Sequence, residues 1–197
     1  RGSMRRGEAT DSVPLRVWIA GCSTGEEAYS IAICITELLD VSATGIPIQI
    51  FATDLSAAAI AVARAGLYPT GIEADVNPER LRRFCTREDN GYRVSKAVRD
   101  CCIFAVQNIT ADPPFSHLDM VSCRNVLIYL QPGAHSRLLA VFHYALKQDG
   151  ILLLGTSESI AAAPTLFTAI DKKHRIYVRT PGNDRAQYLD ITAVLPE

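Results

Sequence analysis

The chain has 197 residues, of which 48% are hydrophobic and 21% are charged, and its formal net charge is −1. This length and composition predict one globular domain with a continuous core, and the near-neutral charge gives no general attraction to nucleic acid or to a membrane surface. The longest apolar runs, such as residues 151–154, are far shorter than the ~20 residues that cross a bilayer, so no direct membrane insertion is expected.

The cysteine and histidine content argues against a metal site. Six cysteines form no Cys-x-x-Cys pair, and the four histidines are scattered singly. Most of the cysteines stand in apolar runs, as small buried side chains do. Because a structural zinc site needs clustered ligands, we predict no metal, and free cysteines of this kind favour a reduced, cytoplasmic setting.

The first elements follow a loose polar segment, residues 1–14, whose start is typical of the remnant of an expression tag. Residues 15–20 are a short β-branched and apolar run that stops at Gly21, which predicts a buried strand. Residues 26–39 carry apolar side chains at three- and four-residue steps and predict a helix.

A second strand and helix are predicted at residues 46–52 and 57–65, with Ser56 as the helix N-cap. The middle of the chain then breaks the alternation with prolines and glycines. An amphipathic stretch is followed by two short strand-like runs, around Asp89–Gly91 and Arg99–Asp100. We therefore predict that residues 78–106 form a small helix and antiparallel strands inserted into the sheet domain.

Regular alternation resumes with a strand, a helix, a strand and a final hairpin, at residues 118–123, 133–147, 150–154, 166–169 and 174–178. Strands joined by crossover helices predict an α/β fold with a mostly parallel sheet, here closed by an antiparallel hairpin. Its ligand crevice should lie beyond the carboxyl ends of the strands. The domain is expected to span residues 15–179, and residues 180–197 to be a tail or a linker to a further domain.

The loop after the first strand contains Gly21 and Gly25 but lacks the middle glycine of a dinucleotide-binding loop. Glu26 and Glu27 stand at the start of the next helix, where they would repel a pyrophosphate. They would attract a ligand that carries an ammonium and a sulfonium group, such as S-adenosylmethionine. The alternative is that both glutamates only complement the helix dipole.

Asp54 ends the second strand of a β-α-β unit. From that position a carboxylate can accept hydrogen bonds from both ribose hydroxyls of an adenosine. As the alternative, Asp54 would be an N-cap of the following helix, in competition with Ser56.

Four segments resemble the chemotaxis-receptor methyltransferase family in order and spacing: residues 21–27, 52–54, 65–69 and 122–129. The resemblance covers about residues 15–179, and residues 112–115 and 155–158 look most like members fused to a methylesterase and sensory domains. It implies a Rossmann-like S-adenosylmethionine-dependent methyltransferase fold with a small inserted β-subdomain. It also implies methylation of glutamate side chains on the cytoplasmic helical region of chemoreceptors.

The same resemblance implies roles for individual residues. Glu27 would meet the amino end of the cofactor's methionine portion, Asp54 would hold the ribose, and Asn108 with Ile109 would flank the adenine. Arg124 and Tyr129 would be the catalytic residues, with Tyr129 near the transferred methyl. The implied cofactor-binding set is Gly21, Ser23, Thr24, Glu27, Asp54, Asn108, Ile109, Arg124 and Asn125.

Two of these assignments have structural alternatives. Arg124 would instead form an ion pair with Asp119 or Glu158, and Tyr129 would be a core aromatic on the helix it begins. The basic residues of the insert either steer it to an acidic receptor surface or form a solvated face: Arg80, Arg82, Arg83, Arg87, Arg93, Lys96 and Arg99.

Residues 1–14 do not resemble the threonine-phenylalanine-phenylalanine-arginine segment, or the helical domain, that precede the first strand in the family. Two other functions therefore stay open. One is a cofactor-binding or docking module of a larger sensory protein, with little activity of its own. The other, which the Cys-Arg-Asn motif at residues 123–125 disfavours, is a small-molecule methyltransferase.

Overall fold

A computed structural model describes residues 12–42 and 45–182. The predicted tag remnant, and most of the predicted N-terminal segment and tail, lie outside these residues. Thr180, the first residue of the predicted tail, is bound to the domain: its amide donates to the Leu166 carbonyl (3.0 Å) and its hydroxyl to the Thr165 carbonyl (2.8 Å). Hydrogen bonds to the domain therefore continue past residue 179.

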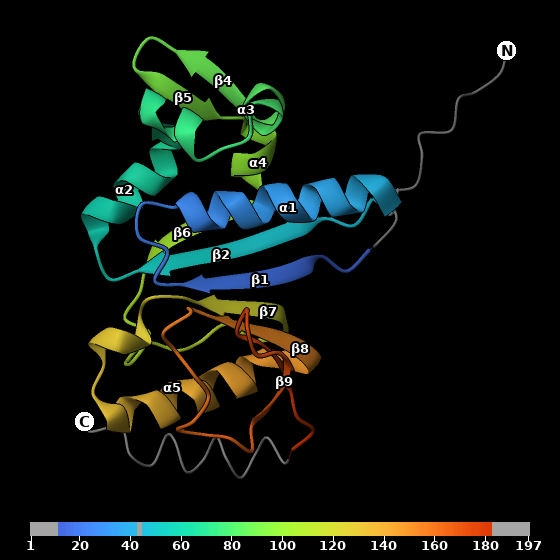
Figure 1. Ribbon diagram of the computed structural model, residues 1–197, viewed down its shortest axis with the longest axis vertical. Helices are drawn as coiled ribbons and strands as arrows, with labels where there is room; N and C mark the ends of the chain where they lie inside the picture. Colours follow the sequence, from blue (N-terminus) through green and yellow to red (C-terminus); the bar gives the residue numbers. More distant parts are fainter. Residues whose placement is uncertain (1–11, 43–44, 183–197) are drawn as a thin grey trace, which may run out of the picture.

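The main sheet has the strand order β6-β2-β1-β7-β8-β10-β9 (Figure 1). Strands β6, β2, β1, β7 and β8 run parallel, and β10 is antiparallel to both of its neighbours. The predicted mostly parallel sheet with a closing hairpin is confirmed. The strand bounds are Leu15–Ala20 (β1), Ile48–Asp54 (β2), Cys102–Val106 (β6), Leu118–Cys123 (β7), Leu146–Leu154 (β8), Phe167–Asp171 (β9) and Ile176–Arg179 (β10).

Helices cover both faces of this sheet because its strands are apolar on both sides. In β1, Val17 and Ile19 pack with α1 (Glu26–Ser42) and α2 (Ala57–Ala65). Trp18, fully buried, packs on the opposite face with α5 (Pro132–Ala145), and its indole donates to the Thr53 hydroxyl at 2.9 Å. These two clusters make a three-layer fold. Ser56 caps α2, as predicted, by accepting from the Ala59 amide.

A second, three-stranded sheet has the order β3-β5-β4 and lies beyond the β6 end of the main sheet in Figure 1. This unit, the small subdomain, differs from the predicted insert in its limits. It begins before residue 78 and ends at Val94, because Cys102–Val106 pairs with β2 as a strand of the main sheet. Its elements are β3 (Leu67–Tyr68), η1 (Thr70–Ala74), α3 (Pro78–Phe84), β4 (Cys85–Glu88) and β5 (Gly91–Val94). Arg99 and Asp100, predicted near a strand, lie in α4 (Lys96–Asp100).

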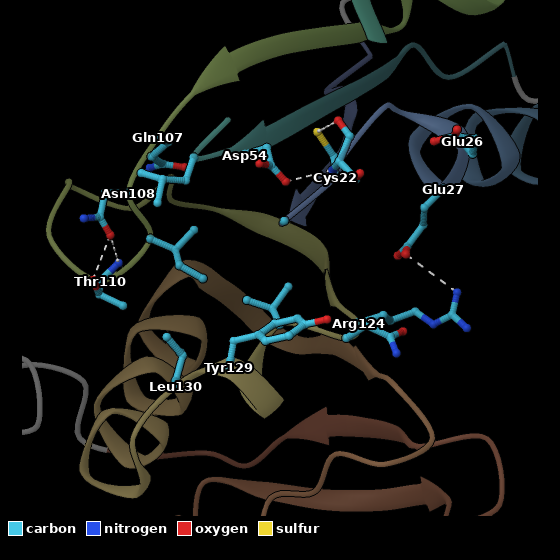
Figure 2. Close-up of a pocket in the computed structure, with 16 residues that line it drawn as sticks. Cys22, Glu26, Glu27, Asp54, Gln107, Asn108, Thr110, Arg124, Tyr129 and Leu130 are labelled. Atoms are coloured by element: carbon cyan, nitrogen blue, oxygen red, sulfur yellow. Dashed lines mark hydrogen bonds and ion pairs between the residues drawn. The ribbon is translucent and has the colours of Figure 1, made fainter. Parts of the chain in front are cut away.

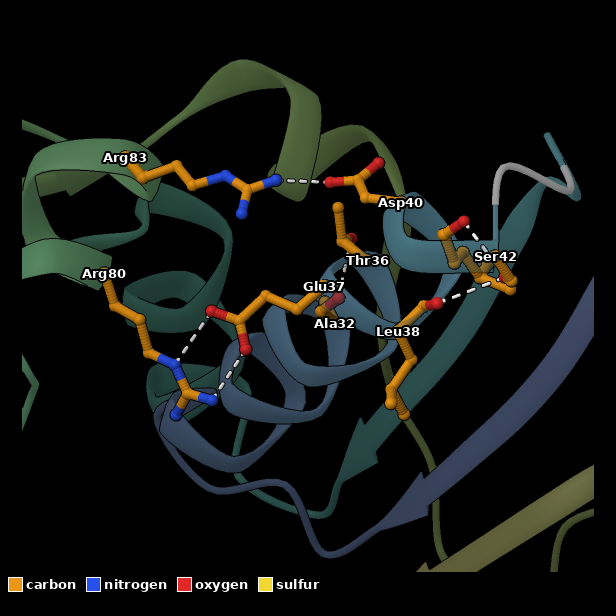
Figure 3. A network of polar contacts seen from close by, with 9 residues as sticks. Ala32, Thr36, Glu37, Leu38, Asp40, Ser42, Arg80 and Arg83 are labelled. Atoms are coloured by element: carbon orange, nitrogen blue, oxygen red, sulfur yellow. Dashed lines mark hydrogen bonds and ion pairs between the residues drawn. The ribbon is translucent and has the colours of Figure 1, made fainter.

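Most basic side chains of the predicted insert are already paired with carboxylates. Figure 3 shows Arg80 donating to Glu37 of α1, with a closest approach of 2.6 Å, and Arg83 paired with Asp40. The further pairs are Arg87–Glu73, Arg93–Glu88 and Lys96–Asp100. Because each pair cancels a positive charge, the region offers much less attraction to an acidic surface than its sequence suggests.

The outer edge of β6 is partly covered by α2. The Ile50 amide donates to the Cys101 carbonyl and the Gln107 amide to the Asp54 carbonyl, so alternate residues of β6 face β2. The Phe104 carbonyl therefore faces the open edge. The Arg64 guanidinium donates to it from α2, with N···O distances of 2.7 and 3.2 Å.

Candidate cofactor-binding site

A cleft of about 780 Å³ opens at the carboxyl ends of β1, β2, β6 and β7 (Figure 2). It lies where the chain crosses from one half of the sheet to the other between β1 and β7, the usual ligand position in such sheets. Its volume falls within the range of small-molecule sites. All the predicted site residues except Thr24 line it; the lining is Gly21, Cys22, Ser23, Glu26, Glu27, Asp54, Leu55, Gln107, Asn108, Ile109, Thr110, Arg124, Asn125, Val126, Tyr129 and Leu130.

The loop after β1 turns sharply against the end of β2. The amides of Gly21 and Cys22 both donate to the Thr53 carbonyl, at 2.8 and 2.9 Å. Gly21 has φ +77°, and a Cβ there would lie 2.3 Å from Val126 Cγ2. Only glycine satisfies both the backbone conformation and the close approach, so this residue sets the shape of the cleft floor.

Asp54 joins this loop to the start of α2. One carboxylate oxygen accepts from the Ser23 amide at 2.8 Å and the other from the Ser56 amide at 2.9 Å. Since Ser56 occupies the N-cap position, the alternative of Asp54 as the N-cap is wrong. A carboxylate oxygen has two lone pairs, so each oxygen of Asp54 can accept one more hydrogen bond from the cleft.

Glu27 and Arg124 lie at the other side of the cleft, where Figure 2 shows their side chains directed toward each other. Arg124 Nη1 is 3.6 Å from Glu27 Oε2, and the Ser122 hydroxyl donates to Glu27 Oε1. The expected alternative partners of Arg124 are wrong. Asp119 is bound by Lys147 at 2.9 and 3.0 Å, and Glu158 by backbone amides.

Asn108 and its neighbours form the turn after β6. The Asn108 amide donates to Asp112, and its side-chain oxygen accepts from the amide and hydroxyl of Thr110 at 3.1 and 2.7 Å. Gln107, which was not among the predicted site residues, also lines the cleft, and its Nε2 donates to the Pro113 carbonyl at 2.9 Å. A polar residue directly after a predicted strand was the signal for it.

Tyr129 ends the short helix η2 (Leu127–Tyr129) and is 81% exposed. The alternative of a core aromatic is therefore wrong, because its ring lies at the mouth of the cleft (Figure 2). Thr24 is the one predicted site residue that turns elsewhere. Its hydroxyl donates to Glu26 at 2.7 Å, and its carbonyl accepts from the Tyr68 hydroxyl at 2.8 Å.

The cleft is acidic. Three carboxylates, those of Glu26, Glu27 and Asp54, line it against one guanidinium, that of Arg124. Burial and the nearby charge of Asp54 raise the pKa of Cys22 to about 12, so this thiol is neutral and does not offer a nucleophile at neutral pH. A ligand with positive charge fits this lining better than a phosphate does.

The described part of the chain holds neither a metal-ligand cluster nor a membrane-spanning helix. Among the residues that the structure describes, no three His, Cys, Asp or Glu side chains come together as a set of metal ligands. In residues 12–42 and 45–182, no helix has the length and apolar character needed to cross a membrane.

Comparison with known proteins assigns this chain to a family. A family model described as CheR methyltransferase, SAM binding domain, matches residues 3–176. The chain is 39% identical over 163 residues to a 104.1 kDa protein of the hypE 3′ region of Rhodobacter capsulatus (83% of this chain, 17% of that protein). It is 36% identical over 161 residues to chemotaxis protein methyltransferase 1 of Pseudomonas aeruginosa (79% of this chain, 59% of that protein).

A solved structure of a TehB-like SAM-dependent methyltransferase from Corynebacterium glutamicum has a TM-score of 0.47 and 14% identity, over 84% of this chain and 78% of that one. The chain spans less than two thirds of the length of both curated relatives. It belongs to the CheR methyltransferase family and corresponds to the S-adenosylmethionine-binding domain of that family.

Proposed function

We propose that this chain is the cofactor-binding catalytic domain, residues 15–179, of an S-adenosylmethionine-dependent protein-glutamate O-methyltransferase. The observation that carries the proposal is Asp54, whose two oxygens are fixed by backbone amides and keep free lone pairs at the end of β2. This arrangement suits a ribose with two adjacent hydroxyls. The acidic lining around it suits the positive charges of the cofactor.

The remaining lining residues divide by their position along the cleft. Glu27 would bind the cofactor's ammonium group, and Asn108 with Ile109 would flank the adenine. Gly21 and Ser23 would approach the cofactor through their backbone, because Gly21 leaves no side chain on the cleft floor. Arg124 and Asn125 would complete the methionine end of the site.

The reaction needs positioning more than acid or base catalysis. The bound cofactor supplies an electrophilic methyl group on a sulfonium. A glutamate side chain, with a pKa near 4.3, is already an anion at neutral pH, so the protein need not remove a proton from it. Arg124, which is 43% exposed and only loosely paired with Glu27, has free donors to orient an incoming carboxylate. Tyr129 can donate a hydrogen bond beside it, and such positioning can contribute ~7–11 kcal/mol.

The proposed substrates are glutamate side chains on the cytoplasmic helical region of chemoreceptors, which implies a cytoplasmic location. The printed names of several relatives, chemotaxis protein methyltransferases, support this substrate class. We also propose fusion to further domains, such as a methylesterase and sensory domains. The match to only 17% of a 104.1 kDa relative is consistent with a domain inside a larger protein.

Calorimetry with S-adenosylhomocysteine tests the cofactor assignment. The wild-type chain should bind, and Asp54→Ala should weaken binding by about a hundredfold, since two hydrogen bonds to a charged acceptor are lost. Asp100→Ala, which removes an exposed carboxylate on α4, is the matched control and should bind as wild type does. Equal binding by the wild type and Asp54→Ala would contradict the assignment.

A second candidate function is a cofactor-binding or docking module with little activity. The observation that favours it is the 81% exposure of Tyr129, because methyl transfer needs a site closed to water. The two functions separate when this chain and a longer protein are each incubated with labelled cofactor and receptor fragments. Base-labile methyl esters with the longer protein support the enzyme, and their absence with both supports the module.

A further inference from the structure

The segment that carries Arg124, Asn125 and Tyr129 is held by a buried carboxylate from a distant part of the chain. Glu158, in the loop after β8, is only 3% exposed and does not line the cleft. One of its oxygens accepts from the amides of Val126 and Leu127, both at 2.8 Å. The other accepts from the amides of Asn125 at 3.1 Å and Gly155 at 2.7 Å.

These four bonds require a carboxylate. An ionised carboxylate has four acceptor positions and no donor, and here each position faces a backbone N–H. An amide in its place would direct an NH2 group at two of those donors. Charge-assisted bonds of this kind also offset the cost of burying the charge. Glu158 is therefore matched to the turn of residues 125–127 in both shape and charge.

The backbone around Glu158 packs closely against its carboxylate. Asn125 is in the left-handed region with φ +59°, which is uncommon for residues other than glycine, and its amide donates to Glu158. A Cβ on Gly155 would lie 2.7 Å from Glu158 Oε2 and 3.0 Å from the Asn125 nitrogen. Any side chain at residue 155 would push the carboxylate and the turn apart.

The opposite end of the same segment is held by His135 of α5. Its Nε2 lies 2.8 Å from the Leu127 carbonyl and 3.1 Å from the Leu130 carbonyl. Because carbonyl oxygens only accept, Nε2 carries the proton and donates to both. Glu158 thus binds the amides at the start of η2, and His135 binds one carbonyl within η2 and one directly after it.

We propose that Glu158 and His135 are positioning residues for the proposed methyl transfer: together they preset residues 124–130 so that Arg124, Asn125 and Tyr129 face the cofactor. We call the contacts of Glu158 and His135 with residues 124–130 the clamp, and its proposed role rests on the proposed function. It acts through the backbone, so neither residue needs to touch cofactor or substrate. A catalytic segment fixed in advance from two other elements loses less entropy when the ligand binds.

The experiment uses the full chain and three measurements: affinity for S-adenosylhomocysteine, hydrogen exchange of the amides of residues 125–127, and methyl transfer to a receptor fragment. Glu158→Gln should weaken binding by about tenfold or more and speed exchange at these amides. Gly155→Ala, which keeps the carboxylate but crowds it, should likewise weaken binding and speed exchange at these amides. His135→Ala should lower kcat more than it raises KM for the receptor, because Tyr129 loses its fixed position.

Two control variants distinguish an effect of the clamp from a general loss of stability, and binding by the wild type tests the proposed function separately. Gly71→Ala adds a methyl group where no atom lies within 4 Å and should leave all measurements unchanged. Asp119→Asn removes a carboxylate at the other end of β7 and should lower stability without changing affinity in the folded protein. If the wild type binds and Glu158→Gln binds equally with normal exchange at residues 125–127, the clamp is wrong. If the wild type does not bind, the proposed function itself fails.

Discussion

The cleft and the small subdomain hold their carboxylates in different ways. In the cleft and just behind it, Asp54 and Glu158 accept from backbone amides of loops. In and beside the subdomain, Glu37 and Glu88 are bound by the side chains of Arg80 and Arg93. Backbone amides fix a carboxylate in place and leave its negative charge intact. A guanidinium also fixes the carboxylate, but its positive charge cancels the negative one.

This difference separates a binding region from a structural one. The cleft keeps a net negative field and open acceptors, which a cationic ligand can use. The subdomain pairs most of its arginines with carboxylates, and its ion pairs with Glu37 and Asp40 tie it to α1. A change in one region should therefore leave the other largely intact, and three predictions test how far this independence goes.

The largest effects should come from the two glycines at which an added Cβ would lie closest to another atom. Gly21→Ala places a methyl group 2.3 Å from Val126 Cγ2, and Gly91→Ala places one 1.9 Å from the Tyr68 carbonyl oxygen. Each should lower the free energy of unfolding by about 2–4 kcal/mol. Only Gly21→Ala should also abolish binding of S-adenosylhomocysteine, as measured by calorimetry at a temperature where both variants are folded.

Gly45→Ala is the control for backbone strain, since Gly45 has φ +61° but a Cβ there would have no atom within 4 Å. It should cost only ~1 kcal/mol. Loss of binding in Gly91→Ala, with the fold intact, would show that the two regions are coupled.

A smaller effect should appear at alkaline pH. Burial and Asp54 raise the pKa of Cys22 in the cleft to about 12, from an ordinary value of 9.0. Above pH 9 the thiol ionises in the unfolded chain but stays protonated in the folded one, so stability falls as pH rises from 9 toward 12. Denaturation of Cys22→Ala should show a shallower decline, by at most about 1.4 kcal/mol per pH unit.

Cys85→Ala in the subdomain sharpens the comparison, because burial alone raises the pKa of that half-buried thiol and the effect should be weaker. Identical pH profiles for the wild type and Cys22→Ala would refute the assignment of a protonated thiol in the cleft.

The smallest effect should follow from Arg80→Ala combined with Arg83→Ala. Both arginines are about half exposed, so their pairs with Glu37 and Asp40 are screened by solvent. Arg80 holds the pKa of Glu37 below its usual value, so any stabilisation is present above pH 4.5 and is lost as the pH falls through the lowered pKa. Urea denaturation at pH 7 and pH 3 should show a small difference from the wild type at pH 7 and a smaller one at pH 3, with unchanged cofactor affinity.

Local signals predicted most of the fold. The Ala-rich run with Ser56 before it gave α2 its observed bounds, and the apolar runs located the parallel strands. The limits of the insert were missed because Cys102–Val106 is short, and only its pairing with β2 distinguishes it from a strand of the small sheet. Ladder partners far apart in sequence leave no local trace.

The candidate site was predictable in its location but less so in its contacts. Residues at or just beyond the ends of strands, such as Asp54 and Asn108, reach the cleft because parallel strands end at one edge. Thr24 shares the loop with Ser23, yet its side chain turns toward Glu26. The pairing of Arg124 with Glu27, and the bonds from the turn of residues 125–127 to Glu158, join residues 31 to 97 positions apart and depend on packing that the sequence does not state.

The contact between Arg64 and the Phe104 carbonyl has a consequence for behaviour in concentrated solution. An edge strand with free carbonyls is a template on which another chain can add a strand, and that is a common start of aggregation. Arg64 occupies the central outward carbonyl of β6 and brings a positive charge to that edge. A neighbouring molecule would have to displace this side chain before it could pair there. Arg64 therefore hinders the addition of a further strand to the main sheet at β6.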